Sequence, residues 1–184
     1  MKVVYIVDDP KVAKVLIDPM RRAILELLRE KPMTQTHLAN ELGLTQASLS
    51  YHTKLLKSKK LINVFQKKAE LHGIIQIYFS TSAYLYVYDL KSLPKDISRY
   101  FYPIALERIR AVISVMLLYD DKYQLKKDVP TITSLSNDLS ELVVESARSY
   151  INMEAKFGRE NIIFDIYTKA ITRLFKQASR LRYK

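Results

Sequence analysis

The chain of 184 residues contains no cysteine, no tryptophan and only three glycines. Without cysteine it can form neither a disulfide framework nor a thiolate-ligated zinc or iron–sulfur centre, and it has no thiol nucleophile. Three glycines are too few for a glycine-rich phosphate-binding loop, and they disfavour a fold built from many tight hairpins. The composition therefore excludes several large classes of enzyme and metalloprotein.

Long apolar runs are also missing from the sequence. The most apolar stretch, Ile104–Tyr119, is interrupted by Glu107, Arg108 and Arg110, whereas a membrane span needs about 20 mostly apolar residues. Residues Met1–Asp9 are too short for a secretory signal. We therefore expect a cytoplasmic protein without a membrane partner, in which residues 104–119 form a buried helix.

Acidic residues are scarce relative to basic ones. Thirty Lys and Arg stand against nineteen Asp and Glu, which gives a formal net charge of +11 and a pI near 9.7. A surplus of this size favours polyanionic partners, either nucleic acid or an anionic membrane surface. The alternative interpretation is the lysine-rich surface of a thermophilic prokaryote. Hydrophobic residues make up 48% of the chain, so we expect one folded domain, or a small domain with an appendage.

The first half of the sequence predicts three short helices followed by a β-hairpin. Helix-capping residues stand at Asp18, Thr34 and Thr45, and helix-ending signals at Pro32, Gly43 and about Lys57. Two β-rich runs follow, Leu61–Lys68 and Ile74–Thr81, with Gly73 in their connection. The order helix, helix, three-residue turn, helix, hairpin predicts a winged helix-turn-helix. We also expect an extra strand or strap at Val3–Val7.

The second half predicts long helices at Ile97–Tyr119 and Ile162–Leu181, with a polar linker at Lys122–Pro130. Seven side chains at steps of three and four residues predict one more continuous helix, ended by Gly158: Leu135, Leu139, Leu142, Ser146, Tyr150, Met153 and Phe157. The run Ala83–Tyr88 fits either a strand or a helix start. The predicted fold class is mainly α with a small β wing. A winged helix-turn-helix domain occupies residues 1–90, and an α-helical C-terminal region occupies residues 91–184.

Two segments resemble the ArsR-type family of winged-helix transcription regulators. Leu16–Leu28 (LIDPMRRAILELL) is similar to the opening helix of that family, and Leu38–His52 (LANELGLTQASLSYH) is similar to its helix-turn-helix. The resemblance covers about residues 11–82 and implies a DNA-binding domain with His52 packed beneath the recognition helix. It also implies a structural role for the arginines that open the first helix; a phosphate contact is the alternative role for Arg22. With the composition, it favours an archaeal source.

The metal-sensing property of that family does not carry over to this chain. Many members bind metals or arsenic through cysteines before the recognition helix, or through histidines and acids on a C-terminal helix. Here there is no cysteine and no histidine after His72, and the three histidines are scattered. We therefore expect no metal and no cofactor.

Residues 45–57 have the chemistry that a recognition helix requires. Leu49, His52 and Leu56 form an inner face, and short polar side chains on the outer face let the backbone enter the major groove. Gln pairs with adenine, Ala and Tyr contact thymine methyl groups, and Ser bonds to any base. The alternative is a small amphipathic helix with a solvated polar face. The predicted DNA-facing residues of this helix are Thr45, Gln46, Ala47, Ser48, Ser50, Tyr51 and Lys54.

A basic stretch extends from this helix into the wing at residues 61–81. The 28 residues between Glu41 and Glu70 include no acid and six lysines. Phosphate contacts supply affinity, whereas base contacts supply preference. The alternative is a solvated lysine run. The predicted backbone-contacting residues are Lys54, Lys57, Lys59, Lys60, Lys67 and Lys68, with His72 at the wing tip and Arg22 in a lower rank.

The apolar seam of the second half predicts either a core or a dimer interface. Two winged helices related by a twofold axis read a palindrome, so we expect a homodimer. Its predicted interface residues are Leu135, Leu139, Leu142, Tyr150, Met153 and Phe157. The alternative for the tyrosine-rich second half is a pocket for an unidentified small-molecule effector.

The leading hypothesis is a dimeric, sequence-specific transcription regulator that binds double-stranded DNA and is nucleoid-associated in the cytoplasm. One alternative is an architectural protein that coats chromosomal DNA with low sequence preference. Another is a winged helix used for protein–protein contact. The sequence has no Gly-x-Ser-x-Gly motif, no metal-ligand spacing and no phosphate loop, so we do not expect an enzyme.

Overall fold

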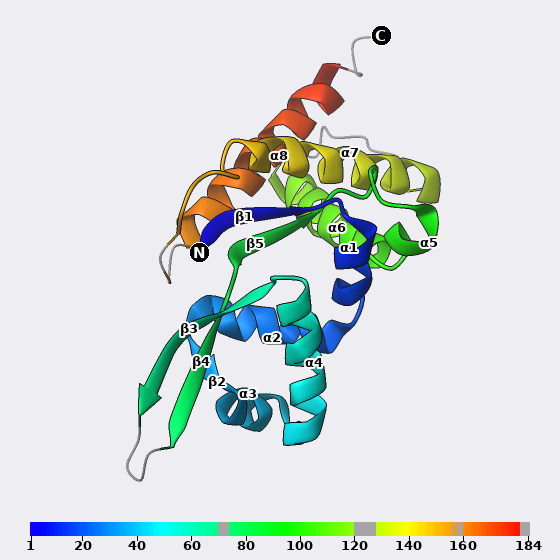
Figure 1. Cartoon of the computed structure of the whole chain (residues 1–184). Coiled ribbons are helices and arrows are strands. Elements are labelled where there is room, and N and C mark those ends of the chain that lie inside the picture. Colours follow the sequence, from blue (N-terminus) through cyan, green and yellow to red (C-terminus); the bar gives the residue numbers. More distant parts are fainter. Residues whose placement is uncertain (70–73, 120–127, 156, 158–159, 181–184) are drawn as a thin grey trace.

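A computed structural model of the chain describes residues 1–69, 74–119, 128–155, 157 and 160–180 (Figure 1). The molecule is mainly α-helical with two small sheets, and a helix-turn-helix with a β wing precedes the C-terminal helices. The predicted fold class is therefore confirmed. His72, Gly73 and Gly158, which the sequence analysis singled out, lie outside the described residues.

Four helices make up the helix-turn-helix part of the chain: α1 (Pro10–Leu16), α2 (Pro19–Glu30), α3 (Gln35–Leu42) and α4 (Gln46–Ser58). The predicted capping residues Asp18, Thr34 and Thr45 each accept a hydrogen bond from a backbone N–H of the following helix. Such bonds satisfy N–H groups that the first helical turn leaves without a partner. The three predicted helices are confirmed. The additional helix α1 was not predicted; Asp9 caps it.

The wing is a three-stranded antiparallel sheet. Its strands are β2 (Met33–Thr34), β3 (Ile62–Ala69) and β4 (Ile75–Thr81), in the order β2-β4-β3. The predicted hairpin is confirmed by the pairing of β3 with β4, and the short strand β2 was not predicted. In Figure 1 the hairpin extends away from the helices to the lower left of the molecule.

A second sheet joins the start of the chain to its middle. Strand β1 (Lys2–Val7) pairs in parallel with β5 (Ala83–Tyr88), and Val4 lies opposite Leu85. The strand predicted at Val3–Val7 is confirmed. Residues 83–88, for which the sequence allowed either a strand or a helix start, form a strand. On its other side, β1 is bonded to the segment that follows α7: the Val3 N–H donates to the Met153 carbonyl at 2.8 Å.

The C-terminal region contains α5 (Lys95–Ser98), α6 (Tyr102–Tyr119), α7 (Val129–Arg148) and α8 (Glu160–Arg180). The prediction of a single helix at Ile97–Tyr119 was wrong, because the helix is interrupted between α5 and α6. Pro103 explains the break. Its ring would clash with the carbonyl of Arg99 in a continuous helix, whereas the first turn of α6 accommodates it.

The predicted continuous seam helix was also wrong. Helix α7 ends at Arg148, so Tyr150, Met153 and Phe157 follow it in turns and irregular backbone. The backbone there bonds to the N-terminal strand instead of continuing a helix, and the Ala155 N–H donates to the Met1 carbonyl at 2.8 Å. Apolar side chains at helical spacing can thus reach a common core without sharing a helix.

Two hydrophobic cores hold the elements together. The first lies within the helix-turn-helix and includes Leu28, Leu49 and Leu56, and the second lies among β1, β5 and the C-terminal helices. Strand β1 contributes Val7 to the first core and Val4 to the second. Residues Ile97 and Phe101, from the predicted C-terminal region, pack in the first core. We keep residues 1–90 and 91–184 as proposed functional regions, although each lends side chains to the core of the other.

Candidate nucleic-acid interface

Helix α4 has one covered and one open face. Leu49 and Leu56 are fully buried against the rest of the helix-turn-helix. On the opposite side, the predicted base-facing residues Thr45, Gln46, Ala47, Ser50, Tyr51 and Lys54 are exposed, and Ser48 is half-buried. The Tyr51 side chain is 61% exposed, which leaves it free to meet a ligand. The helix therefore presents short polar groups beside one aromatic ring.

The orientation of α4 is fixed by the turn that precedes it and by a polar contact with α3. Gly43 ends α3 with a φ of +62°, a left-handed conformation that glycine adopts without steric cost. Across the two helices, Gln35 Nε2 donates to Thr53 Oγ1 at 3.0 Å. The sequence analysis missed this pair, because nothing in the sequence links residues 18 positions apart on two different helices.

His52 lies beneath the exposed face, as the resemblance implied. Its imidazole Nδ1 is 3.7 Å from Asp18 Oδ2, and its ring meets the Tyr51 ring edge-on at 5.6 Å between centroids. Asp18 also accepts a hydrogen bond from the Met20 N–H at the start of α2. His52 thereby joins α4 to the first turn of α2.

The two arginines that open α2 bond within the domain. Arg22 Nη1 donates to the carbonyls of Leu16 and Ile17, both at 2.7 Å, and Arg21 Nε donates to the Val15 carbonyl. These carbonyls belong to the end of α1, where a helix lacks its own donors. Both arginines thus stabilise the end of α1, and a phosphate contact by Arg22 stays a prediction.

The predicted phosphate-contacting lysines are open to solvent. Lys54, Lys57, Lys60, Lys67 and Lys68 are exposed and Lys59 is half-buried. Within the described part of the chain, none of the six lies within ion-pair distance of an acid. Their charges are therefore not neutralised by the protein itself.

Lys60 stands at the end of α4 in a left-handed conformation with a φ of +55°. The Leu61 N–H donates to the Leu56 carbonyl at 3.0 Å, and the Lys60 N–H donates to the Lys57 carbonyl at 3.0 Å. This pair of bonds closes the helix as a Schellman motif, whose left-handed position is usually a glycine. A lysine here costs backbone strain of about 1–2 kcal/mol. It also places a cation where α4 meets the wing.

The wing also exposes apolar side chains that the sequence analysis did not assign to the surface. Phe65 is 51% and Ile75 62% exposed, and Val64 and Ile77 are exposed as well. The Phe65 ring packs edge-on against Phe157 at 5.8 Å between centroids. The available signal was the alternation of Ile75 and Ile77 with polar or half-polar neighbours in β4, but alternation alone does not say which face is covered.

The predicted dimer-interface residues do not form one exposed surface. Leu139, Leu142 and Tyr150 are buried in the second core, and Leu135 packs against that core. Met153 is exposed, and Phe157 contacts the wing. The described apolar side chains that are exposed on the C-terminal helices are others: Val115 and Leu118 on α6, Val129 on α7 and Phe164 on α8.

A charged hydrogen-bond cluster ties the turn after α7 to α8. The Tyr150 hydroxyl donates to Asp165, and Lys169 Nζ donates to the Tyr150 oxygen at 2.7 Å and to Asp165 at 2.9 Å. The hydrogen bond from Tyr150, followed by that from Lys169, lowers the pKa of Asp165. Each of these polar groups is thus engaged within the chain rather than facing a ligand.

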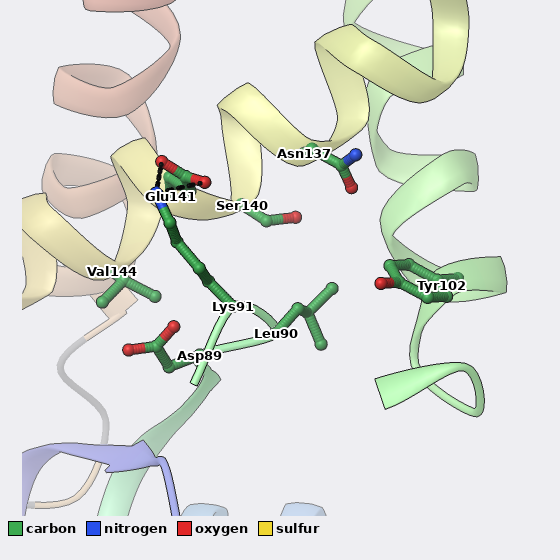
Figure 2. A pocket seen from close by; sticks show the side chains of 8 residues that line it. All are labelled: Asp89, Leu90, Lys91, Tyr102, Asn137, Ser140, Glu141 and Val144. Carbon is green, nitrogen blue, oxygen red and sulfur yellow. Dashed lines mark hydrogen bonds and ion pairs between the residues drawn. The ribbon is translucent and has the colours of Figure 1, made fainter. Parts of the chain in front are cut away.

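Among the described residues, no group of three or more His, Asp or Glu side chains gathers in a way that could hold a metal ion. In the same residues, no helix combines the length and the apolar character that a membrane crossing needs. A small hollow of about 200 Å³ lies between the loop after β5 and helix α7 (Figure 2). There Lys91 Nζ is paired with Glu141 at 3.2 Å, and Asp89 adds a second acid, so the hollow has no uncompensated positive charge.

Comparison with known proteins agrees with the geometry of the N-terminal half. Residues 16–64 match a family model described as a helix-turn-helix domain. The chain is also similar to the transcriptional repressor SdpR of Bacillus subtilis (strain 168), with 36% identity over 56 residues. That match covers 30% of this chain and 62% of the length of the repressor. Residues 16–64 of this chain are thus similar to a helix-turn-helix domain.

Proposed function

We propose that the protein is a transcription regulator that binds double-stranded DNA with sequence preference. In this proposal, α4 enters the major groove and the β3–β4 wing contacts the backbone. The observation that carries the proposal is the open face of α4, whose polar side chains lie next to lysines that have no acidic partner in the described chain. The match to a helix-turn-helix domain, and the likeness to a protein named as a transcriptional repressor, support it.

The outer face of α4 should carry base preference. We expect Gln46→Ala and Tyr51→Ala to narrow the affinity gap between the protein's own promoter fragment and random DNA, because each removes a side chain exposed on the first two turns of the helix. Losing a good base contact costs roughly 1–3 kcal/mol of discrimination. Fluorescence anisotropy with both fragments, across a range of salt concentrations, measures the gap.

Tyr100→Ala is the matched control, because Tyr100 is 49% exposed and lies outside the helix-turn-helix. It should leave the gap unchanged. A wild-type protein that binds both fragments equally at every salt concentration would favour the architectural role instead. Little affinity for either fragment would favour a protein-interaction module.

We further propose that two copies act together. One winged helix reads only a few base pairs, and a twofold pair reads two half-sites one helical turn apart. Apolar side chains exposed on the C-terminal helices, Val115 and Leu118 on α6 and Phe164 on α8, support self-association through this region. Sedimentation of the full chain at tens of micromolar separates a dimer from a monomer, and a monomer contradicts the proposal.

A further inference from the structure

A cleft of about 340 Å³ separates the helix-turn-helix from the C-terminal helices. Helix α2 lines one side with Arg22 and Arg29, and α6 and α8 line the other with Arg108 and Tyr167. Apolar side chains from β5, α6 and α8 supply the remaining wall, among them Leu85 and Ile104. Its volume lies within the range of small-molecule pockets.

The three arginines of the cleft are not equivalent. Arg29 is paired with Glu26 at 2.7 Å and lies 3.8 Å from Glu160, so its charge is compensated. Arg22 and Arg108 have no acid within ion-pair distance anywhere in the described residues. The acids that line the cleft, Glu26 and Glu160, are thus both beside Arg29. Two guanidinium groups without an acidic partner remain, and Arg22 uses only its Nη1 for the carbonyls at the end of α1.

Arg108 and Tyr88 are both held in place by aromatic contacts. The Arg108 guanidinium lies over the Tyr167 ring, 5.4 Å from its centroid, and the Tyr88 ring stacks on Phe101 at 4.1 Å between centroids. Among the residues that the structure describes, no group bonds to the Tyr88 hydroxyl. Burial raises the pKa of Tyr88 to about 12, and the positive charges of Arg22 and Arg108 act against this rise. Arg22, Arg108 and Tyr88 line the same cleft, and the Tyr88 hydroxyl stays protonated at neutral pH and can donate to a ligand there.

We propose that this cleft binds a small organic anion, in which a carboxylate or phosphate group on an apolar body meets Arg22, Arg108 and the Tyr88 hydroxyl. Guanidinium groups bind carboxylate and phosphate oxygens through paired, charge-assisted hydrogen bonds. The apolar wall of the cleft covers the body of the ligand. The hollow in Figure 2 lacks this character, because Glu141 already neutralises its lysine.

The position of the cleft gives the ligand a regulatory role, and this part rests on the proposed function. Helix α2 packs against α4, so an anion bridging α2 and α6 acts on the element that supports the recognition helix. A ligand shifts an equilibrium only by its differential affinity for two states. Binding to the cleft is accordingly expected to change the affinity for promoter DNA.

The test is a ligand-observed NMR titration of the full chain with benzoate and with phenyl phosphate, without DNA. We expect saturable binding in the millimolar range or tighter, as suits ligands of about ten heavy atoms. Benzamide, which lacks the charge, and acetate, which lacks the body, should each bind at least about tenfold more weakly. Whether benzoate or phenyl phosphate binds more tightly identifies the natural anionic group.

Arg108→Gln should weaken binding of the better acid by about tenfold or more, because a charge-assisted contact is lost. Arg110→Gln is the matched control: it lies on the same helix, is paired with Glu107 and does not line the cleft. Both arginines are exposed, so neither change should unfold the chain.

The proposal is overturned if neither acid binds saturably, if benzamide binds as well as benzoate, or if Arg108→Gln has no more effect than Arg110→Gln. It is also overturned if Arg108→Gln weakens DNA binding in the absence of any acid, because the arginine would then belong to the DNA surface. The titration contains no DNA, so its result does not depend on the proposed function. If the protein shows no sequence preference for DNA, anion binding to the cleft still stands, and only its regulatory role is lost.

Discussion

Replacing Val4 with aspartate is expected to destabilise the second core so strongly that the C-terminal helices lose their cooperative packing. Val4 is 1% exposed and lies opposite Leu85 in the parallel β1–β5 pair. A carboxylate at this position has no partner, and its burial costs several kcal/mol. A whole domain has a free energy of unfolding of only about 5–15 kcal/mol. This single change therefore removes a large part of that free energy. Thermal unfolding followed by near-UV circular dichroism should show a loss of at least about 10 °C in Tm.

Val129→Asp is the matched control for this prediction. Val129 is 78% exposed in the first turn of α7, where an acid also complements the helix dipole. We expect its Tm to change by less than about 2 °C. Equal effects of the two substitutions would show that β1 does not lie within the second core.

The double substitution Lys67→Gln and Lys68→Gln should lower the affinity for all DNA sequences alike. Both lysines are exposed near the end of β3, where the proposed wing contact meets phosphates. Each lost contact should reduce the salt slope by about 1. Each phosphate contact releases about 0.9 counterions. The two lysine contacts together therefore account for about a tenfold loss of affinity between 50 and 200 mM salt. Anisotropy titrations at several salt concentrations measure this slope.

Lys91→Gln with Lys95→Gln removes the same charge from the linker after β5 and from α5, and it should leave the slope nearly unchanged. In both double variants, the difference in affinity between the promoter fragment and random DNA should stay nearly unchanged. If the wing variant loses the gap while Gln46→Ala and Tyr51→Ala keep it, the wing is the reader of sequence and α4 is not.

The helix-turn-helix could be predicted because its signals are local. Asp18, Thr34 and Thr45 each bond to a backbone N–H within three residues, and Gly43 adopts the left-handed turn by itself. Spacing also placed Leu49 and Leu56 on the buried face of α4. In these cases, the interactions that form the element lie within a few residues of each other along the chain.

The rest depends on contacts between distant parts of the chain. The parallel pairing of β1 with β5 joins residues about eighty positions apart, and the end of α7 is decided by the N-terminal strand that bonds beyond it. The arginine cleft likewise exists only because α2, α6 and α8 meet. No sequence pattern links Arg22 to Arg108, and only the fold brings both to the cleft that Tyr88 lines.

The placement of β1 also sets an order of events during synthesis. This strand leaves the ribosome before its bonding partners at Ser82 and Met153, which follow about 80 and 150 residues later. At 5–20 residues per second, the second partner is made roughly 8–30 s after the strand. Helices form in about a microsecond, so α2, α3 and α4 can assemble while Val3 and Val4 still lack their core. The part that we propose to bind DNA thus forms early. The C-terminal half is completed later, when β1 pairs with the segment near Met153 and closes the long stretch of chain between them.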